Sequence, residues 1–387
     1  MAMSFNNLKI KLMFVLLLVF TGCSNWTEPE VNVYDDCPLD QINKDEAYYK
    51  ALRAYKASEH SVAFGWFSGW GEGSANVSPM LSAVPDSVDI ISLWDNYRNL
   101  SDAKKKDLEY VQKVKGTKVL RCSFIQYVGC GFTPSEYNQD EAEREAFWGW
   151  EDGNEEAIRA SLAKYAKAIN DTIAFYGYDG LDIDFEPFVD GYKGKLDENS
   201  TYVQWFLDEL CKYLGPKSQS GKMLVIDGEI TRIPVACITY FDYYISQAYS
   251  VSGGTPPPTA GTTAYNKDLR LSQFIDKYES ELEPEVLTNK FIITENLESA
   301  MDCLNGGFFW TDIQNRKWNK NVMPSLVGFS SWQPYNGFRK GGFGGYKFNN
   351  EAVSNTPYKW LRKAIQQQNP APGVKIITDD DYVAPNK

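Results

Sequence analysis

The chain has 387 residues and a formal net charge of −12, and 43% of its residues are hydrophobic. This length suits one α/β barrel with tails and a large core, whereas the negative charge argues against nucleic-acid partners, because phosphate contacts need clustered lysine and arginine. A single histidine, His60, excludes a multi-histidine metal site and argues against a Ser-His-Asp triad, so carboxylates must carry any acid–base chemistry, and we expect no metal or cofactor.

The N-terminal segment has the pattern of a processing signal. Two lysines precede an apolar run, Leu12–Phe20, which is too short to span a bilayer and is typical of the hydrophobic part of a signal peptide. The run ends in Phe-Thr-Gly-Cys, which resembles the bacterial lipobox, whose cysteine becomes the lipidated first residue. We predict a signal peptide at 1–22, a tether at 23–40 and a lipid anchor at Cys23, which would hold the protein in the cell envelope, on the outer membrane surface. A plain secretory signal with a chance cysteine is the alternative.

Over residues 41–370, short apolar runs alternate with helical patterns, and a tail follows at 371–387. This alternation is typical of βα units and a parallel sheet. Eight strands are the number of a (β/α)8 TIM barrel, which is the fold class we predict. His60 lies just before the first strand, where a structural role is expected. The candidate strands are Ser61–Phe67, Val88–Trp94, Lys118–Phe124, Gly180–Phe185, Lys222–Ile226, Tyr243–Ala248, Lys290–Thr294 and Ser325–Ser330.

The helices and connections complete the predicted barrel. A first helix is expected around Asp45–Ala57, and Ser101 and Gly116 should cap the helix that follows the second strand. Only about sixteen residues separate the fifth and sixth strands, and they include Pro234, so a crossover helix hardly fits and the barrel should be irregular there. The Gly- and Pro-rich stretch Val251–Thr263 is expected to form a loop over the barrel mouth.

The cysteine pattern leaves two alternatives open. Export would permit disulfides, and six cysteines allow fifteen pairings among which the sequence does not choose. Buried thiols are equally compatible with the sequence. No Cys-x-x-Cys pair occurs, so neither a zinc knuckle nor a redox motif is indicated. The six cysteines after Cys23 are Cys37, Cys122, Cys130, Cys211, Cys237 and Cys303.

The segment Tyr178–Pro187 carries an unusual set of acidic residues. It reads Tyr-Asp-Gly-Leu-Asp-Ile-Asp-Phe-Glu-Pro, and side chains on a strand alternate between its two faces. Asp182, Asp184 and Glu186 therefore share one face, about 6–7 Å apart along the strand. Like charges in a shielded site raise each other's pKa and destabilise the fold, so this arrangement at the active end of a barrel strand indicates function. A solvated acidic strand end or a metal site is the alternative.

Residues Asp179 to Glu186 fill every position of a D-G-x-D-x-D-x-E pattern and resemble the motif of glycoside hydrolase family 18, which contains chitinases and endo-β-N-acetylglucosaminidases. The resemblance covers about residues 60–365. Ser246–Tyr249 resembles the family's strand-six motif, and Trp332 follows the expected eighth strand, where the family places the tryptophan floor of its sugar site. Asp179, the first motif residue, is included among the candidates for substrate binding.

The resemblance implies a retaining hydrolysis in which the substrate's own 2-acetamido oxygen is the nucleophile. Glu186 would be the general acid and then the general base, which needs a raised pKa. Asp184 would accept a hydrogen bond from the acetamido N–H and stabilise the oxazolinium ion. Asp182 would share a proton with Asp184, so that the two titrate as a coupled pair.

The resemblance also implies substrate contacts from other strand ends. Tyr249 would donate to the acetamido oxygen, Gln247 would help to hold it, and Trp332 would support the apolar face of the sugar. Asp227 and Glu295, near the ends of the fifth and seventh strands, are candidates for contacts with sugar hydroxyls, with solvated loop positions as the alternative.

Two departures from the family's chitinases favour one activity. Those chitinases usually carry Met-x-Tyr-Asp in strand six, where this chain has Gln247 and Ser250 in place of the Met and the Asp. The short connection between strands five and six resembles small bacterial endo-β-N-acetylglucosaminidases, which cut the two-sugar core of N-linked glycans. We predict this activity, with an N-glycan or another N-acetylglucosamine-containing oligosaccharide as partner and a monomeric chain. A chitinase is the alternative, and the presence of Glu186 argues against a lectin.

Overall fold

The computed structural model describes residues 44–72, 79–95, 97–187, 194–198, 200–250, 264–310 and 323–370. The predicted signal peptide, the lipid anchor at Cys23, the tether, Cys37, the predicted loop 251–263 and the tail 371–387 lie outside these residues. No helix within the described ranges is long and apolar enough to cross a membrane.

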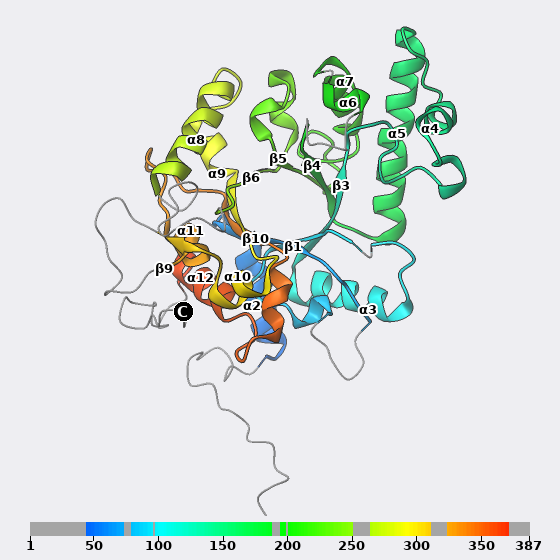
Figure 1. The fold of residues 1–387 in the computed structure, drawn as a ribbon. Coiled ribbons are helices and arrows are strands. Elements are labelled where there is room, and N and C mark those ends of the chain that lie inside the picture. The colour runs from blue at the N-terminus through cyan, green and yellow to red at the C-terminus, as the bar shows by residue number, and fades with distance from the viewer. Residues whose placement is uncertain are drawn as a thin grey trace, which may run out of the picture. The chain divides into compact units, whose positions relative to one another are not determined.

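Eight parallel strands close into a barrel in the order β1-β10-β7-β6-β5-β4-β3-β2 (Figure 1). The predicted (β/α)8 barrel is therefore confirmed, and seven of its strands lie within two residues of their expected bounds. The strands are β1 (Val62–Phe67), β2 (Ile90–Leu93), β3 (Lys118–Phe124), β4 (Gly180–Phe185), β5 (Met223–Gly228), β6 (Tyr243–Gln247), β7 (Phe291–Asn296) and β10 (Gly342–Tyr346).

Helices surround the barrel (Figure 1). Ser101 caps α3 by accepting a hydrogen bond from the Lys104 amide, and a π-helical turn at 111–115 then ends at Gly116 with a φ of 73°, so both predicted caps are confirmed. The α-helices within the described ranges are α2 (Glu46–Lys56), α3 (Asp102–Tyr110), α4 (Glu141–Trp148), α5 (Glu155–Tyr176), α6 (Lys195–Glu198), α7 (Ser200–Leu210), α8 (Ala264–Tyr278), α9 (Pro284–Asn289), α10 (Ala300–Asn305), α11 (Ser325–Ser331) and α12 (Lys359–Gln368).

The connection between β5 and β6 is irregular, as the sequence predicts. Residues 229–242 contain two 3-10 turns, η5 (Ile230–Arg232) and η6 (Val235–Tyr240), in place of an α-helix. Pro234 lies between the two turns and removes a backbone donor that a continuous helix would use. This sector of the barrel is therefore covered by short turns rather than by a crossover helix.

The predicted eighth strand is wrong. Residues 325–330 belong to the helix α11, and the barrel is closed by β10, which pairs with β1 and β7. All six residues are buried. The spacing of apolar residues in this run therefore has no periodicity that would distinguish a helix from a strand. β10 contains three glycines, which disfavour strands; a Cβ at Gly342 would lie 2.1 Å from the Val62 carbonyl oxygen, so glycine permits close pairing here. A separate pair, β8 (Phe309–Trp310) and β9 (Met323–Pro324), lies before α11.

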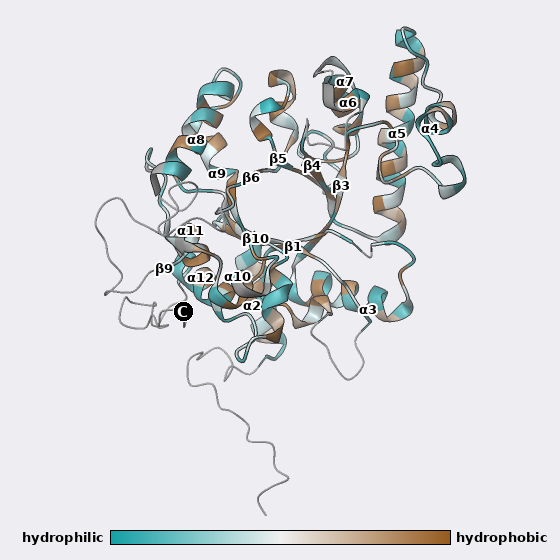
Figure 2. Ribbon diagram, viewed as in Figure 1, coloured by the Kyte–Doolittle hydropathy of each residue, from teal (hydrophilic) through white to brown (hydrophobic). Residues whose placement is uncertain are grey.

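Two apolar layers build the core. The outer layer lies between strands and helices and includes Leu181 and Ile183 of β4, so the apolar face of this strand points where the sequence predicts. Figure 2 shows that long helices such as α5 and α8 carry both hydrophobic and hydrophilic residues, as expected for helices with one face on a barrel. The inner layer fills the barrel with Val62, Phe64, Trp66, Ile90, Leu120, Cys122, Val225, Ile245 and Ile292.

Candidate active site

The acidic strand β4 places its carboxylates inside the barrel. Asp182 and Asp184 are buried, with exposed fractions of 0% and 2%, and Glu186 follows the last strand residue and is half-buried. The strand runs toward the carboxyl end of the parallel barrel, which is the end where barrel enzymes bind substrate. The geometry that the alternation predicts is thus present, and the catalytic roles of the three residues remain predictions.

Asp182 is held by donors from β1 and β2, across the interior of the barrel. Its Oδ2 accepts hydrogen bonds from Trp66 Nε1 at 2.9 Å and from Ser92 Oγ at 2.6 Å. Burial raises the pKa of Asp182 to about 6, although these two hydrogen bonds favour the carboxylate form. Neither donor can be predicted from the sequence, because each is an ordinary strand residue far from β4 in the chain.

Asp184 lies beside a further buried aspartate, Asp227 of β5, and the two residues are paired in the strand register. Burial, together with the charges of Glu186 and Asp182, raises the pKa of Asp184 well above its usual range. Burial, followed by the charges of Asp184 and Asp182, also raises the pKa of Asp227. Three acidic groups in one low-dielectric space cannot all be ionised, so they must share protons. Because Asp227 is fully buried, the structure does not support its predicted contact with a sugar hydroxyl.

One cluster of the described residues has the composition of a metal site. The potential ligand atoms of Cys122, Asp182 and Asp227 lie within 4.8 Å of one another. Burial and the neighbouring aspartates raise the pKa of the Cys122 thiol well above its usual value, and a protonated thiol is a poor ligand. Asp182 also uses one carboxylate oxygen to accept hydrogen bonds from two side chains. The cluster is better suited to sharing protons than to binding a metal.

Gln247 connects the buried aspartates to Glu186. Its Nε2 donates to Asp227 Oδ1 at 2.7 Å, and its side chain also forms a hydrogen bond with Glu186. Burial raises the pKa of Glu186, the hydrogen bond from Gln247 opposes this rise, and the nearby Glu229 adds to it. A carboxyl group with a raised pKa can remain protonated closer to neutral pH, which a general acid requires.

A cavity of about 350 Å³ opens beside Glu186. It lies against the irregular connection between β5 and β6, so the missing crossover helix leaves space next to the carboxyl group. Its polar lining offers both hydrogen-bond donors and acceptors, which suits a ligand rich in hydroxyl groups. Besides Glu186, the lining includes Gly228, Glu229, Thr231, Gln247, Arg270 and Gln273.

Aromatic side chains at three strand ends pack together near the carboxyl cluster. Tyr249, just after β6, stacks on Tyr346 at the end of β10, with ring centroids 6.3 Å apart. Tyr346 also meets Trp94 edge to face at 5.4 Å. Burial, followed by the charges of nearby carboxyl groups, raises the pKa of Tyr249, so its phenol stays protonated and can donate. Flat rings of this kind can stack on the C–H face of a sugar.

Tyr346 and Trp94 were missed by the sequence reasoning. The available signal was an aromatic residue at the carboxyl end of a barrel strand, but Tyr346 lies on the glycine-rich strand β10, which was not recognised. The structure places Trp332, the predicted floor, elsewhere. Its ring belongs to the outer core, and its Nε1 donates to Asp268 Oδ1 at 3.0 Å, because the residues before it form α11 instead of a barrel strand.

Two further substrate-binding candidates are not brought to the site. Asp179 lies at the opposite, amino end of β4 and accepts hydrogen bonds from the Val119 amide and from Gln112 Nε2, so its role is structural. Glu295 lies on the outer face of β7, opposite to the inward-facing Ile292. It accepts hydrogen bonds from the amide and hydroxyl of Ser250 at 2.8 and 2.5 Å, so it supports the backbone that follows Tyr249 without facing the sugar.

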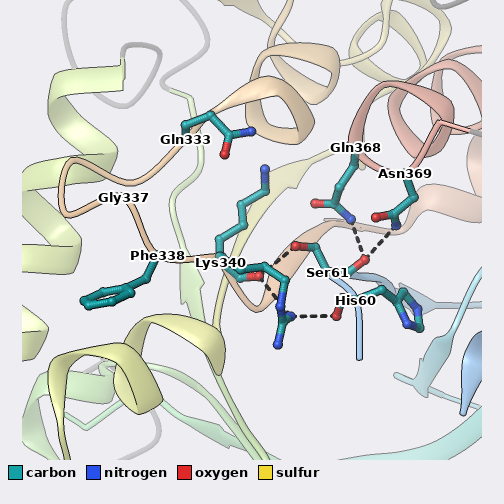
Figure 3. Close-up of a pocket in the computed structure, with 9 residues that line it drawn as sticks. His60, Ser61, Gln333, Gly337, Phe338, Lys340, Gln368 and Asn369 are labelled. Carbon is teal, nitrogen blue, oxygen red and sulfur yellow. Dashed lines mark hydrogen bonds between the residues drawn. The ribbon is translucent and has the colours of Figure 1, made fainter. Parts of the chain in front are cut away.

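A second cavity of about 350 Å³ lies near the start of β1 and β10 (Figure 3). Gln368 and Asn369 donate their side-chain amides to the carbonyl oxygen of Ser61, and Lys340 Nζ donates to two buried carbonyl oxygens. His60 bonds the carboxylate of Asp89 and the Ser58 carbonyl oxygen, which agrees with the structural role expected for it. This is the amino end of the barrel, where such contacts generally serve stability.

The structure describes cysteines that are present as thiols. Cys122, Cys211 and Cys237 are free thiols, and Cys122 and Cys237 are buried. The predicted alternative of buried thiols therefore applies to Cys122 and Cys237.

A closed (β/α)8 barrel with carboxyl groups at the carboxyl end of β4 has the elements that a glycoside hydrolase needs. The chain belongs to glycoside hydrolase family 18, and the group of that family described as BT1044-like matches residues 27–367. It is similar to endo-beta-N-acetylglucosaminidase F2 of Elizabethkingia meningoseptica, with 25% identity over 353 residues, which cover 87% of this chain and 88% of the relative.

Two solved structures resemble this fold. A selenomethionine form of BT1044 is 28% identical with a TM-score of 0.71, covering 87% of this chain and 96% of the other. The endo-beta-N-acetylglucosaminidase of Cordyceps militaris, in complex with fucosyl-N-acetylglucosamine-Asn, is 19% identical with a TM-score of 0.56, covering 86% of this chain and 99% of the other. At that identity the second likeness concerns the fold alone.

Proposed function

We propose that the protein is an endo-β-N-acetylglucosaminidase that hydrolyses the N,N′-diacetylchitobiose core of N-linked glycans and leaves one N-acetylglucosamine on the asparagine. The observation that carries this proposal is the polar cavity beside Glu186, where the barrel has turns instead of a crossover helix. Such an opening gives a branched, protein-linked substrate access to the acid. The similarity to endo-beta-N-acetylglucosaminidase F2 supports the same activity.

The proposed mechanism assigns the steps to Glu186 and Asp184. Glu186, whose pKa is raised by burial, protonates the glycosidic oxygen, while the acetamido oxygen of the substrate attacks the anomeric carbon. Asp184 accepts the acetamido N–H and stabilises the positive charge of the oxazolinium ion. Tyr249, held protonated beside the carboxyl groups, donates to the acetamido oxygen and orients it. Glu186 then removes a proton from the water that opens the oxazoline ring.

The test of the substrate class compares two substrates for the same purified protein. We expect kcat/KM on an N-glycopeptide to exceed kcat/KM on a chitin pentasaccharide by at least about tenfold, because the opening beside Glu186 suits a branched substrate. Mass spectrometry of both reactions identifies the products. A higher kcat/KM on the chitin oligosaccharide would show the alternative activity, a chitinase, and binding of glycans without products would show a lectin.

We also propose that the protein is a lipoprotein of the cell envelope, anchored through Cys23, with the outer membrane surface as its location. We expect Cys23→Ala to move the protein from the membrane fraction to the soluble fraction while kcat stays at the wild-type value, because the anchor is separate from the barrel. The measurement is fractionation followed by the mass of the mature N-terminus. If the wild-type N-terminus carries no acyl groups, the anchor is disproved; Cys211→Ala serves as the cysteine control.

A further inference from the structure

Asp227 has a position that the proposed mechanism does not use. Its side chain is completely buried in the barrel, and it is paired in register with Asp184 on the neighbouring strand. Its Oδ1 accepts the hydrogen bond from Gln247 Nε2 at 2.7 Å, whereas its Oδ2 finds no donor within the described part of the chain. One oxygen is thus directed to the residue that contacts Glu186, and the other hydrogen bonds of Asp227 are with the carboxyl groups of Asp182 and Asp184, which require a shared proton.

Three buried carboxyl oxygens share this lack of a donor. Asp182 Oδ1 and Asp184 Oδ1 are in the same state as Asp227 Oδ2 within the described residues, and the carboxyl oxygens of Asp182 and Asp227 approach within 4.8 Å. An ionised carboxylate can only accept hydrogen bonds, so three ionised groups would leave all these acceptors unsatisfied in a low-dielectric space. Protons on the carboxyl groups supply the missing donors.

The hydrogen-bond partners of each aspartate indicate which of the three carries a proton. Asp182 accepts from Trp66 and Ser92, and both bonds favour its charged form. Asp184 must stabilise the positive oxazolinium ion in the proposed mechanism, which a carboxylate does and a neutral carboxyl group does not. Asp227 accepts only one side-chain donor, from Gln247, and cannot reach the sugar because it is fully buried. Of the three aspartates, Asp227 is therefore the one that can stay protonated without disturbing the proposed mechanism.

We propose that Asp227 is a positioning residue that remains protonated in the working enzyme, donates from Oδ2 to the Asp182–Asp184 pair and accepts from Gln247 at Oδ1. It thereby stabilises negative charge on the pair and orients the amide that contacts Glu186. The inference rests on the proposed hydrolase activity of this site and adds a link between the aspartate pair and the acid.

The charged and titratable groups that face Asp227 favour its protonated form, and the hydrogen bond from Gln247 opposes them. They are Asp182 and Asp184 on β4, Cys122 on β3 and Tyr249 after β6, and none of them carries a positive charge. Burial, followed by Asp184 and Asp182, raises the pKa of Asp227 well above its usual range. Its neutral form therefore persists to higher pH than that of an exposed aspartate, and the link is lost as pH rises through the raised pKa.

The test compares Asp227→Asn with Asp227→Ala. Asparagine keeps an oxygen for Gln247 and presents a non-titrating N–H₂ donor to the aspartate pair. We expect Asp227→Asn to lower kcat by less than about tenfold, whereas Asp227→Ala lowers kcat by more than about 100-fold. A loss in Asp227→Asn as large as in Asp227→Ala would overturn the proposal.

A matched control is Asp242→Asn. Asp242 is a partly buried aspartate that accepts the Leu224 amide away from the carboxyl cluster, so its variant should keep the wild-type kcat. An infrared difference spectrum between wild type and Asp227→Asn provides a readout without turnover. We expect the C=O stretch of a protonated carboxyl group in the wild type at pH 7 and its loss in the variant. Absence of that band contradicts the inference about Asp227, even if the protein acts on a substrate other than N-glycans.

Discussion

Glu186→Gln is expected to lower kcat on an N-glycopeptide by about 10²-fold or more, because glutamine keeps the shape of the side chain but cannot protonate the leaving oxygen. The measurement is product formation followed by mass spectrometry, with glycan binding measured in parallel. Binding should persist, since the aromatic cluster of Tyr249, Tyr346 and Trp94 is unchanged. Glu155→Gln is the matched control, because Glu155 lies on the outer helix α5 in an exposed pair with Arg159.

The pH dependence of kcat provides a second test of Glu186 as the general acid. Burial raises the pKa of Glu186, so the acid form that starts the reaction is present below that raised pKa and is lost as pH rises through it. The slow residual reaction of Glu186→Gln should lack this loss. Turnover by Glu186→Gln close to that of the wild type would remove Glu186 from the role of general acid.

Asp184→Asn is expected to slow hydrolysis by about 10²-fold or more while leaving the enzyme able to use a sugar oxazoline supplied from outside. The buried carboxyl group of Asp184 stabilises the positive oxazolinium ion, and asparagine does not. Glu186 remains present to activate an acceptor. Incubated with a glycan oxazoline and an N-acetylglucosamine acceptor, the variant should therefore form the transfer product and hydrolyse it slowly.

The competing mechanism uses an enzyme carboxylate as the nucleophile. Asp184 and Glu186 come from one strand and share one face, so neither is placed across the sugar from the other. A fluorosugar substrate followed by intact-protein mass spectrometry separates the two mechanisms. A stable glycosyl adduct on an Asp or Glu would refute the substrate-assisted mechanism, and the same protein with Asp184→Asn identifies the contribution of that residue.

The sequence predicts most of the barrel because its strands are continuous apolar runs with clear boundaries. β3 and β4 have the predicted bounds, since Gly116 ends the helix before β3 and a glycine likewise precedes β4. The eighth strand fails for a physical reason. In β10 glycine is needed for close pairing with β1, yet glycine carries no apolar signal, whereas the buried helix α11 does.

Some residues of the candidate site can be predicted from the local sequence, and others cannot. Asp182, Asp184 and Glu186 follow from the alternation of one strand, which is a local property of the sequence. Ser92 and Trp66 reach Asp182 only because the barrel closes, and they lie 90 and 116 residues away from it in the chain. Trp332 was misplaced because its prediction depended on the wrong eighth strand, and Tyr346 was missed for the same reason.

The most direct test of the proposed function is the mass that remains on the asparagine of a defined N-glycopeptide after digestion. We expect the wild-type protein to leave the peptide with one N-acetylglucosamine and to release the rest of the glycan as a free oligosaccharide, while Glu186→Gln leaves the glycopeptide intact under the same conditions. A peptide that keeps its whole glycan in the wild-type reaction, or that loses every sugar, would contradict the assignment of an endo-β-N-acetylglucosaminidase.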